Sequence, residues 1–189
     1  DSGCEDLRVN AINAAPNGAT YTWNISGGSP FTSSSHSQSF LFTSPGVNSM
    51  SLFVDSIGCS AGDTIDIVVF PGPDVSFTYT PLSGCTDINV SLTNSSPILF
   101  GDNYLWTFGN GNTDTLYSPP NQIFANTNNI NDSVLPIKLA IYTESGCSDS
   151  LIQTVTVHPI PNASFVASDT NVCEKVIISF QNNSVGGIF

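Results

Sequence analysis

The residues of this sequence whose chemistry is most readily predicted are its five cysteines, Cys4, Cys59, Cys85, Cys147 and Cys173. Close pairs such as C-x-x-C, which zinc sites usually use, are absent, so disulfide bonds are favoured over bound metal or free thiols. Cys59 follows Cys4 by 55 residues, and Cys147 follows Cys85 by 62. We therefore expect disulfides Cys4–Cys59 and Cys85–Cys147, with Cys173 left unpaired in this chain.

Oxygen-bearing side chains alternate at Asn110, Asn112 and Asp114, in the spacing that calcium-binding loops use. One carboxylate with two amides is a weak ligand set, and asparagine is also common in turns because it tolerates left-handed backbone. The three residues are therefore weak calcium candidates and good turn residues, and no other cofactor is expected.

The two histidines form no recognisable catalytic pattern. His36 lies in a serine-rich polar stretch, and His158 ends an apolar run directly before Pro159. A Ser-His-Asp arrangement is defined by geometry, which a serine-rich sequence does not supply. We expect no catalytic residue and no enzyme activity.

The element that organises the chain is predicted from the stretch Tyr104 to Gly111, YLWTFGNG. Its aromatic residues alternate, as in a half-buried strand, and the Gly-Asn-Gly that follows can adopt positive φ in a turn. A tryptophan at the centre of such a strand suits a small β-sandwich that closes over the indole. The expected core signature is Trp23, Tyr104, Trp106, Phe108, Gly109 and Gly111.

Short apolar runs rich in β-branched and aromatic residues recur along the chain, separated by Gly, Pro, Ser or Asn. They predict an all-β fold with almost no helix. In the first part of the chain the expected strands are Leu7 to Asn13, Ala19 to Ile25, Gln38 to Phe42, Ser49 to Asp55 and Thr64 to Phe70. In the second part they are Val75 to Thr80, Ile88 to Asn94, Asn103 to Phe108, Thr113 to Tyr117, Gln122 to Ala125, Pro136 to Thr143 and Ser150 to His158.

Internal repeats define the domain organisation. The stretch from Cys4 to Pro16 matches Cys85 to Pro97 at an offset of 81, and Cys173 to Ser184 matches the same stretch 88 residues on. The joint at residues 70–77 matches residues 158–165, and its prolines favour an extended connection. We expect an elongated array of tandem immunoglobulin-like β-sandwich modules at 1–73 and 74–159, with the truncated start of a third at 160–189.

The composition limits the classes of partner. Acidic residues outnumber basic ones by 15 to 3, for a formal charge of −12, so nucleic acid and anionic membranes are poor partners. No apolar run is long enough to span a membrane, and no signal-peptide pattern opens the sequence. We expect a part of a longer extracellular protein, without membrane insertion in this part.

Two motifs resemble a known family. The hexapeptide from Trp106 to Gly111, WTFGNG, resembles the W-x-F-G-D-G signature of polycystic kidney disease (PKD) repeats. Gly84-Cys85, together with the stretch from Gly146 to Pro161, resembles the cysteine-containing PKD arrays of Bacteroidetes surface proteins. Asn110 replaces the usual aspartate of the signature, so a calcium role of that aspartate does not carry over.

The resemblance implies a non-catalytic repeat segment of a large bacterial cell-surface adhesin, exported by type IX secretion and used in gliding motility. The segment would act as a disulfide-stapled extracellular spacer, because a cross-linked module cannot extend beyond its covalent loop. The expected partners are neighbouring repeats of the same chain, with surface polysaccharide or the substratum as a further option. The alternative is a PKD stalk or polysaccharide-binding accessory module of a secreted hydrolase.

A third motif concerns modification. The triplet of Asp, then Ser or Thr, then Ala, Ile, Leu, Met, Thr or Val resembles the O-glycosylation sequence of Bacteroidetes. The sequence contains five such triplets, whereas about one is expected by chance at average composition. Turn aspartates that precede strands give the same triplet, so both interpretations stay open. The candidate acceptors are Ser56, Thr64, Thr115, Ser133 and Ser150.

Overall fold

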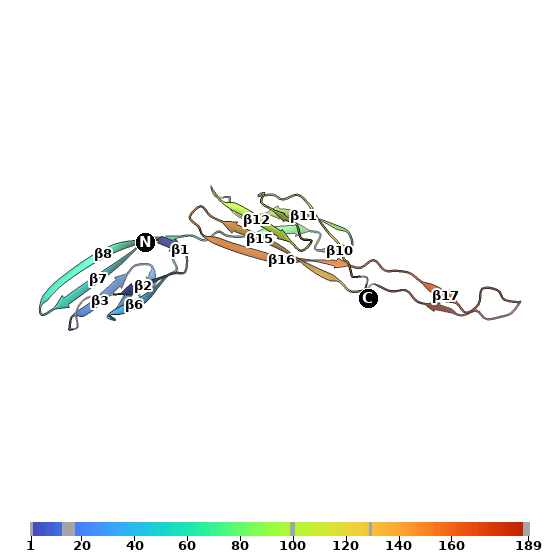
Figure 1. Ribbon diagram of the computed structural model, residues 1–189, viewed down its shortest axis with the longest axis horizontal. Helices are drawn as coiled ribbons and strands as arrows, with labels where there is room; N and C mark the ends of the chain where they lie inside the picture. The colour runs from blue at the N-terminus through green and yellow to red at the C-terminus, as the bar shows by residue number, and fades with distance from the viewer. Residues whose placement is uncertain (1, 13–17, 99–100, 129, 187–189) are drawn as a thin grey trace. The chain divides into compact units, whose positions relative to one another are not determined.

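A computed structural model of the chain describes residues 2–12, 18–98, 101–128 and 130–186. The described residues form strands and no helix, so the predicted all-β class is confirmed (Figure 1). They include no helix that is long and apolar enough to cross a membrane. Asn13, the last residue of an expected strand, lies outside the described residues.

The chain forms two compact units, each built around an immunoglobulin-like sandwich of two sheets. The first unit comprises residues 1–74, 98–102 and 142–149, and the second comprises residues 75–97, 103–141 and 150–189. The module limits expected from the sequence, 1–73, 74–159 and 160–189, stay a prediction.

In the first unit, a five-stranded sheet with the order β1-β8-β7-β3-β5 packs against a three-stranded sheet with the order β2-β6-β4. Strands β7 and β8 form one long antiparallel hairpin (Figure 1). The bounds are β1 Ser2–Cys4, β2 Leu7–Ile12, β3 Thr20–Ile25, β4 Gly28–Ser29, β5 Thr32–Ser33, β6 Ser37–Phe42, β7 Gly46–Ser56 and β8 Cys59–Phe70.

The second unit repeats this plan. Its five-stranded sheet has the order β10-β16-β15-β12-β13, and its three-stranded sheet has the order β14-β11-β9. The bounds are β9 Phe77–Thr80, β10 Ser83–Cys85, β11 Ile88–Asn94, β12 Asn103–Phe108, β13 Thr113–Asp114, β14 Gln122–Phe124, β15 Ser133–Tyr142 and β16 Ser148–His158.

A tryptophan lies in the core of each sandwich, as the alternation predicted. Trp106 in β12 is fully buried, and Trp23 in β3 is 5% exposed. Each indole N–H donates to a backbone carbonyl 3.0 Å away, that of Leu116 for Trp106 and that of Ser35 for Trp23. Each core therefore satisfies the one polar atom of its largest side chain.

The turn after β12 needs its glycines for two different reasons. Gly111 has a φ of 90°, in the left-handed region that favours glycine. Gly109 donates to the carbonyl of Pro136 at 2.7 Å, and a Cβ on it would lie 2.7 Å from Pro136 Cδ. The close approach of β12 to β15 therefore leaves no room for a side chain at residue 109.

Two three-residue strands were not predicted from the sequence. Strand β1 pairs in parallel with the end of β8, and β10 pairs in parallel with the end of β16. Both carry the tripeptide Ser-Gly-Cys, and each places its cysteine at the last pair of its parallel ladder. These strands fix the position of Cys4 and Cys85.

The third repeat contributes one described pair of strands, β17 Phe165–Ala167 and β18 Phe180–Asn182. Phe165 is paired with Asn182, as Phe77 of β9 is paired with Asn94 of β11. Phe165 and Phe180 are 70% and 68% exposed, so this pair buries little apolar surface.

Candidate functional site

A disulfide bond joins Cys4, at the end of β1, to Cys147, in the turn between β15 and β16. The two Cα atoms are 5.5 Å apart, a normal distance for a disulfide. The cysteines are 143 residues apart and belong to different sequence repeats, although residues 142–149 cluster with the first unit. The expected pairings, Cys4 with Cys59 and Cys85 with Cys147, are therefore wrong.

The strand register explains why Cys4 does not pair with Cys59. Cys4 is paired with Phe70, the last residue of β8, whereas Cys59 is the first residue of the same strand. At about 3.3 Å per residue, the two ends of β8 lie roughly 35 Å apart. A disulfide requires Cα atoms within about 7 Å of each other.

The same geometry separates Cys85 from Cys147. Cys85 is paired with His158, the last residue of β16, whereas Cys147 directly precedes Ser148, the first. We call Cys4 and Cys85 the strand cysteines, and Cys59 and Cys147 the hairpin cysteines. Within each repeat, the two kinds lie at opposite ends of one long strand.

Three cysteines carry free thiols: Cys59, Cys85 and Cys173, all exposed. Cys147, by contrast, is 1% exposed in its disulfide. The chain thus has one disulfide bond, whose Cys4 is partly exposed, and three thiols accessible to solvent.

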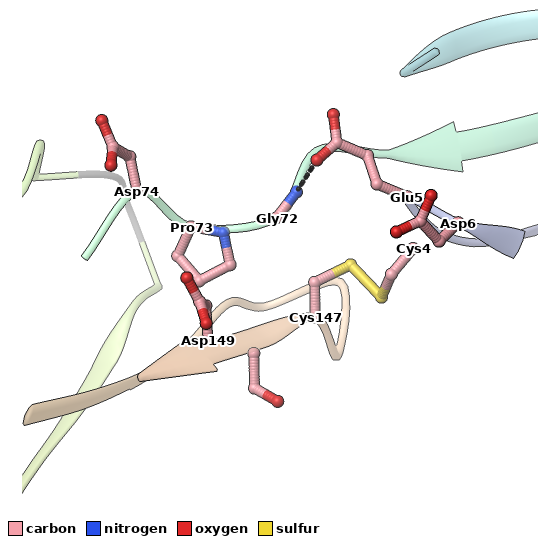
Figure 2. A pocket seen from close by; sticks show the side chains of 9 residues that line it. Cys4, Glu5, Asp6, Gly72, Pro73, Asp74, Cys147 and Asp149 are labelled. Atoms are coloured by element: carbon pink, nitrogen blue, oxygen red, sulfur yellow. Dashed lines mark hydrogen bonds between the residues drawn. A yellow bond between two sulfur atoms is a disulfide. The ribbon is translucent and has the colours of Figure 1, made fainter. Parts of the chain in front are cut away.

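A pocket of about 390 Å³ opens beside the disulfide (Figure 2). The carboxylate of Glu5 accepts a hydrogen bond from the backbone N–H of Gly72 at 3.3 Å, which links the end of β1 to the joint after β8. The lining residues are Cys4, Glu5, Asp6, Gly72, Pro73, Asp74, Cys147, Ser148 and Asp149.

Four of these lining residues are acidic, and none is basic. Within the described part of the chain, however, no three His, Cys, Asp or Glu side chains converge as a metal site requires. The pocket therefore gives the disulfide an acidic, solvent-accessible surrounding without a recognisable ligand set.

The calcium candidates take part in turn hydrogen bonds. The Asn110 amide donates to the carbonyl of Ile123 at 2.9 Å, and its oxygen accepts from the backbone N–H of Asn112 at 3.0 Å. The Asn112 amide donates to Gln122 Oε1 at 3.0 Å, and Asp114 accepts from the backbone N–H of Leu116 at 2.7 Å. Turn chemistry accounts for all three residues, and calcium binding stays a prediction.

The glycosylation candidates lie in different surroundings. Thr64, Thr115 and Ser150 are exposed, whereas Ser56 and Ser133 are half-buried. Ser133 donates to the side-chain oxygen of Asn126 at 2.7 Å, so its hydroxyl is part of the loop before β15. Glycosylation of these five residues stays a prediction.

Neither histidine is placed in a catalytic arrangement. His158 Nδ1, at the end of β16, lies 2.8 Å from Asp132 Oδ1, and the ring of His36 packs edge-on against Tyr21. The absence of enzyme activity stays a prediction.

Comparison with known proteins gives similarity of fold alone. No family model matches the chain, and no curated protein matches it. Among solved structures, an amphioxus IgVJ-C2 molecule is 14% identical, with a TM-score of 0.34, over 82% of this chain and 99% of that chain. Murine CEACAM1b is 14% identical, with a TM-score of 0.31, over 82% and 95%. SGBP-B of the Bacteroides ovatus mixed-linkage glucan utilization locus, in complex with a mixed-linkage heptasaccharide, is 12% identical, with a TM-score of 0.28, over 90% and 68%.

Proposed function

We propose that this chain is a non-catalytic spacer segment of a large extracellular adhesin, built from tandem PKD-type β-sandwich repeats. Within that class, the motifs around Trp106 and Cys147 favour a SprB-like adhesin of bacterial gliding motility, exported by type IX secretion. The proposal assigns the repeats a mechanical role: they hold a binding region at a distance from the cell surface.

The observation that carries the proposal is the Cys4–Cys147 disulfide. It closes a covalent loop over 143 residues and connects two sequence repeats. Disulfides persist in oxidising compartments, which supports an extracellular location. A cross-link of this kind limits how far the chain can extend under tension, which is a property that a load-bearing spacer uses.

The surface chemistry supports the same role. The chain has a formal charge of −12 and only 3 basic residues, so repeats repel one another and stay soluble. Of the pockets found among the described residues, that at the disulfide and one of about 250 Å³ lined mainly by apolar residues are open hollows on the first unit. Neither brings together a nucleophile, a base and a group that orients the base, as catalysis by covalent attack requires.

The proposal is tested on living cells of the source organism with an antibody raised against this chain. Beads coated with the antibody are expected to attach to intact cells and to be carried along them as the cells glide. Recovery of the antigen in the culture medium, together with a hydrolase activity that the antibody removes, would instead identify a stalk of a secreted enzyme.

A further inference from the structure

The two repeats place their strand cysteines in the same way. Cys4 is paired in parallel with Phe70, and Cys85 is paired in parallel with His158, each at the last residue of the long strand. The backbone N–H after each cysteine donates to that residue's carbonyl, Glu5 to Phe70 at 3.0 Å and Thr86 to His158 at 3.1 Å. Cys85 therefore occupies the position in the second repeat that Cys4 occupies in the first.

The hairpin cysteines are equivalent as well. Cys59 follows the turn of Ile57 and Gly58, which both have positive φ, and it starts β8. Cys147 follows Gly146, which also has positive φ, and it directly precedes β16. Each lies at the tip of the longest hairpin of its sandwich, the end remote from the strand cysteine of the same repeat.

The observed bond therefore joins two different kinds of cysteine in successive repeats. It joins the strand cysteine of one repeat, Cys4, to the hairpin cysteine of the repeat that follows, Cys147. Cys85 has a strand cysteine's position but a free, exposed thiol, and Cys59 has a hairpin cysteine's position and is also free and exposed. If every strand cysteine pairs with the hairpin cysteine of the next repeat, the partners of Cys85 and Cys59 lie in other repeats.

We propose that Cys85 is a cross-linking site for the hairpin cysteine of a repeat that follows the second, and that Cys59 is one for the strand cysteine of a repeat that precedes the first. The partner in both cases is a further sandwich repeat of this type. Cys173 matches the strand cysteines in sequence and takes the hairpin cysteine of a fourth repeat. Each bond then staples one repeat to the next, and no bond lies within a repeat.

The bond forms by thiol–disulfide exchange with a low-molecular-weight disulfide as oxidant. One cysteine thiolate attacks the small disulfide, forms a mixed disulfide and releases one small thiol. The second cysteine thiolate attacks the protein sulfur of the mixed disulfide and releases the other small thiol. Two protein thiols are oxidised, and one small disulfide is reduced to two thiols.

The overlap of such bonds has a consequence for extension. Because Cys85 precedes Cys147 in the sequence and its proposed partner follows Cys147, the covalent loops closed by the two bonds overlap along the chain. In a chain under tension, the force passes from Cys4 to Cys147 through the disulfide. It then passes along 26 residues of backbone to Cys173 and the bond proposed for it. Most of each sandwich thus lies outside the path that carries the load.

The test uses the full chain, extended so that the third repeat is complete: residues 1–184 followed by residues 97–161, since Ser184 matches Ser96. The added hairpin carries Glu144→Asp at an exposed position, so that its peptide differs in mass from the original. The protein is oxidised with glutathione disulfide, its free thiols are alkylated, and it is digested without reduction for mass spectrometry.

The proposal predicts that the marked hairpin peptide is joined to the Cys85 peptide, with Cys4–Cys147 retained and Cys173 alkylated. In the Cys85→Ser variant, the marked hairpin thiol is expected to be alkylated. A bond between the marked hairpin and Cys173, which would lie within one repeat, overturns the proposal, as does a free marked hairpin beside an intact Cys4–Cys147 bond.

A second measurement does not depend on folding of the extension. The 189-residue chain, mapped in the same way, is expected to give Cys4–Cys147 and alkylated Cys59, Cys85 and Cys173. A Cys4–Cys59 or Cys85–Cys147 peptide overturns the rule. The inference rests on the proposed function only for the presence of further repeats. The two experiments can therefore fail separately: the bead experiment can fail while the disulfide map agrees with the rule, and the map can disagree while the beads are carried along the cells.

Discussion

At the scale of single residues, Gly109 is the position with the least tolerance for a side chain in the second sandwich. A Cβ there would lie 2.7 Å from Pro136 Cδ and 3.0 Å from Pro136 N, a backbone atom. We predict that Gly109→Ala lowers the free energy of unfolding by about 1–3 kcal/mol, because β12 and β15 must move apart. Urea unfolding followed by circular dichroism measures the change.

The matched control for this substitution is Gly72→Ala. The nearest atom to a Cβ at Gly72 is Glu5 Oε2, at 3.6 Å, an ordinary contact. Its effect is expected to stay within about 0.5 kcal/mol. Equal losses of unfolding free energy at both positions would show that the close approach of Gly109 to Pro136 does not limit the side chain at residue 109.

Ile57 offers the opposite change, a gain in stability. It has a φ of 54° in the two-residue turn before Cys59, a conformation that β-branched residues avoid, and its side chain is fully exposed. Ile57→Asn gives an Asn-Gly turn, which favours this hairpin geometry. We predict a gain of about 1 kcal/mol in protein made without glycosylation.

The control for Ile57→Asn is Ile152→Asn, on β16, where the isoleucine is 58% exposed and the backbone is extended. Asparagine is disfavoured in strands, so this substitution is expected to lower the stability. A loss at Ile57 as large as that at Ile152 would contradict the role assigned to the left-handed turn.

At the scale of elements, β12 organises the second sandwich through Trp106. The indole is fully buried, its centroid is 5.1 Å from that of Phe77, and its N–H is bonded to Leu116. We predict that Trp106→Ala destabilises the second unit by about 3–5 kcal/mol. Leu105→Ala, next in sequence and 36% exposed, is expected to cost much less.

Fluorescence separates the two units in this experiment. The chain has 2 tryptophans, so Trp23 alone reports in the Trp106→Ala variant. Its urea transition is expected to keep the midpoint that it has in the parent chain, while circular dichroism shows the loss in the second unit. A shift of the Trp23 transition by the full amount would contradict separate cores.

The sequence predicted those elements whose apolar residues alternate over their whole length. Strands β11 and β12 begin and end at the predicted residues, because every second side chain of each faces the core. The first half of β8 was missed because residues 59–66 are exposed on both faces and are held as a strand by pairing with β7. The sequence of β8 alone does not predict that these residues pair with β7.

The disulfide could not be predicted for a related reason. The distance between Cys4 and Cys59 depends on the length of β8 and on the parallel pairing of β1 at its far end, and both are tertiary features. The Ser-Gly-Cys tripeptides of β1 and β10 were the available signal, since they are identical in the two repeats. Three residues with one glycine are too short to predict a strand by alternation.

Across the whole molecule, the Cys4–Cys147 disulfide limits how far the chain can be extended. The bond closes a loop over 143 residues, and an extended chain of that length spans roughly 500 Å. As long as the bond is intact, the residues inside this loop do not add to the length of a chain that is pulled by its ends. Reduction releases it.

Pulling single molecules of the 189-residue chain by their two ends, with and without a reducing agent, measures this limit on extension directly. We predict that reduction lengthens the fully extended chain by roughly 500 Å, and that Cys85→Ser leaves this difference unchanged. A difference that falls by roughly 200 Å in the Cys85→Ser variant would show that the cysteines pair within repeats, and would contradict the Cys4–Cys147 cross-link between repeats.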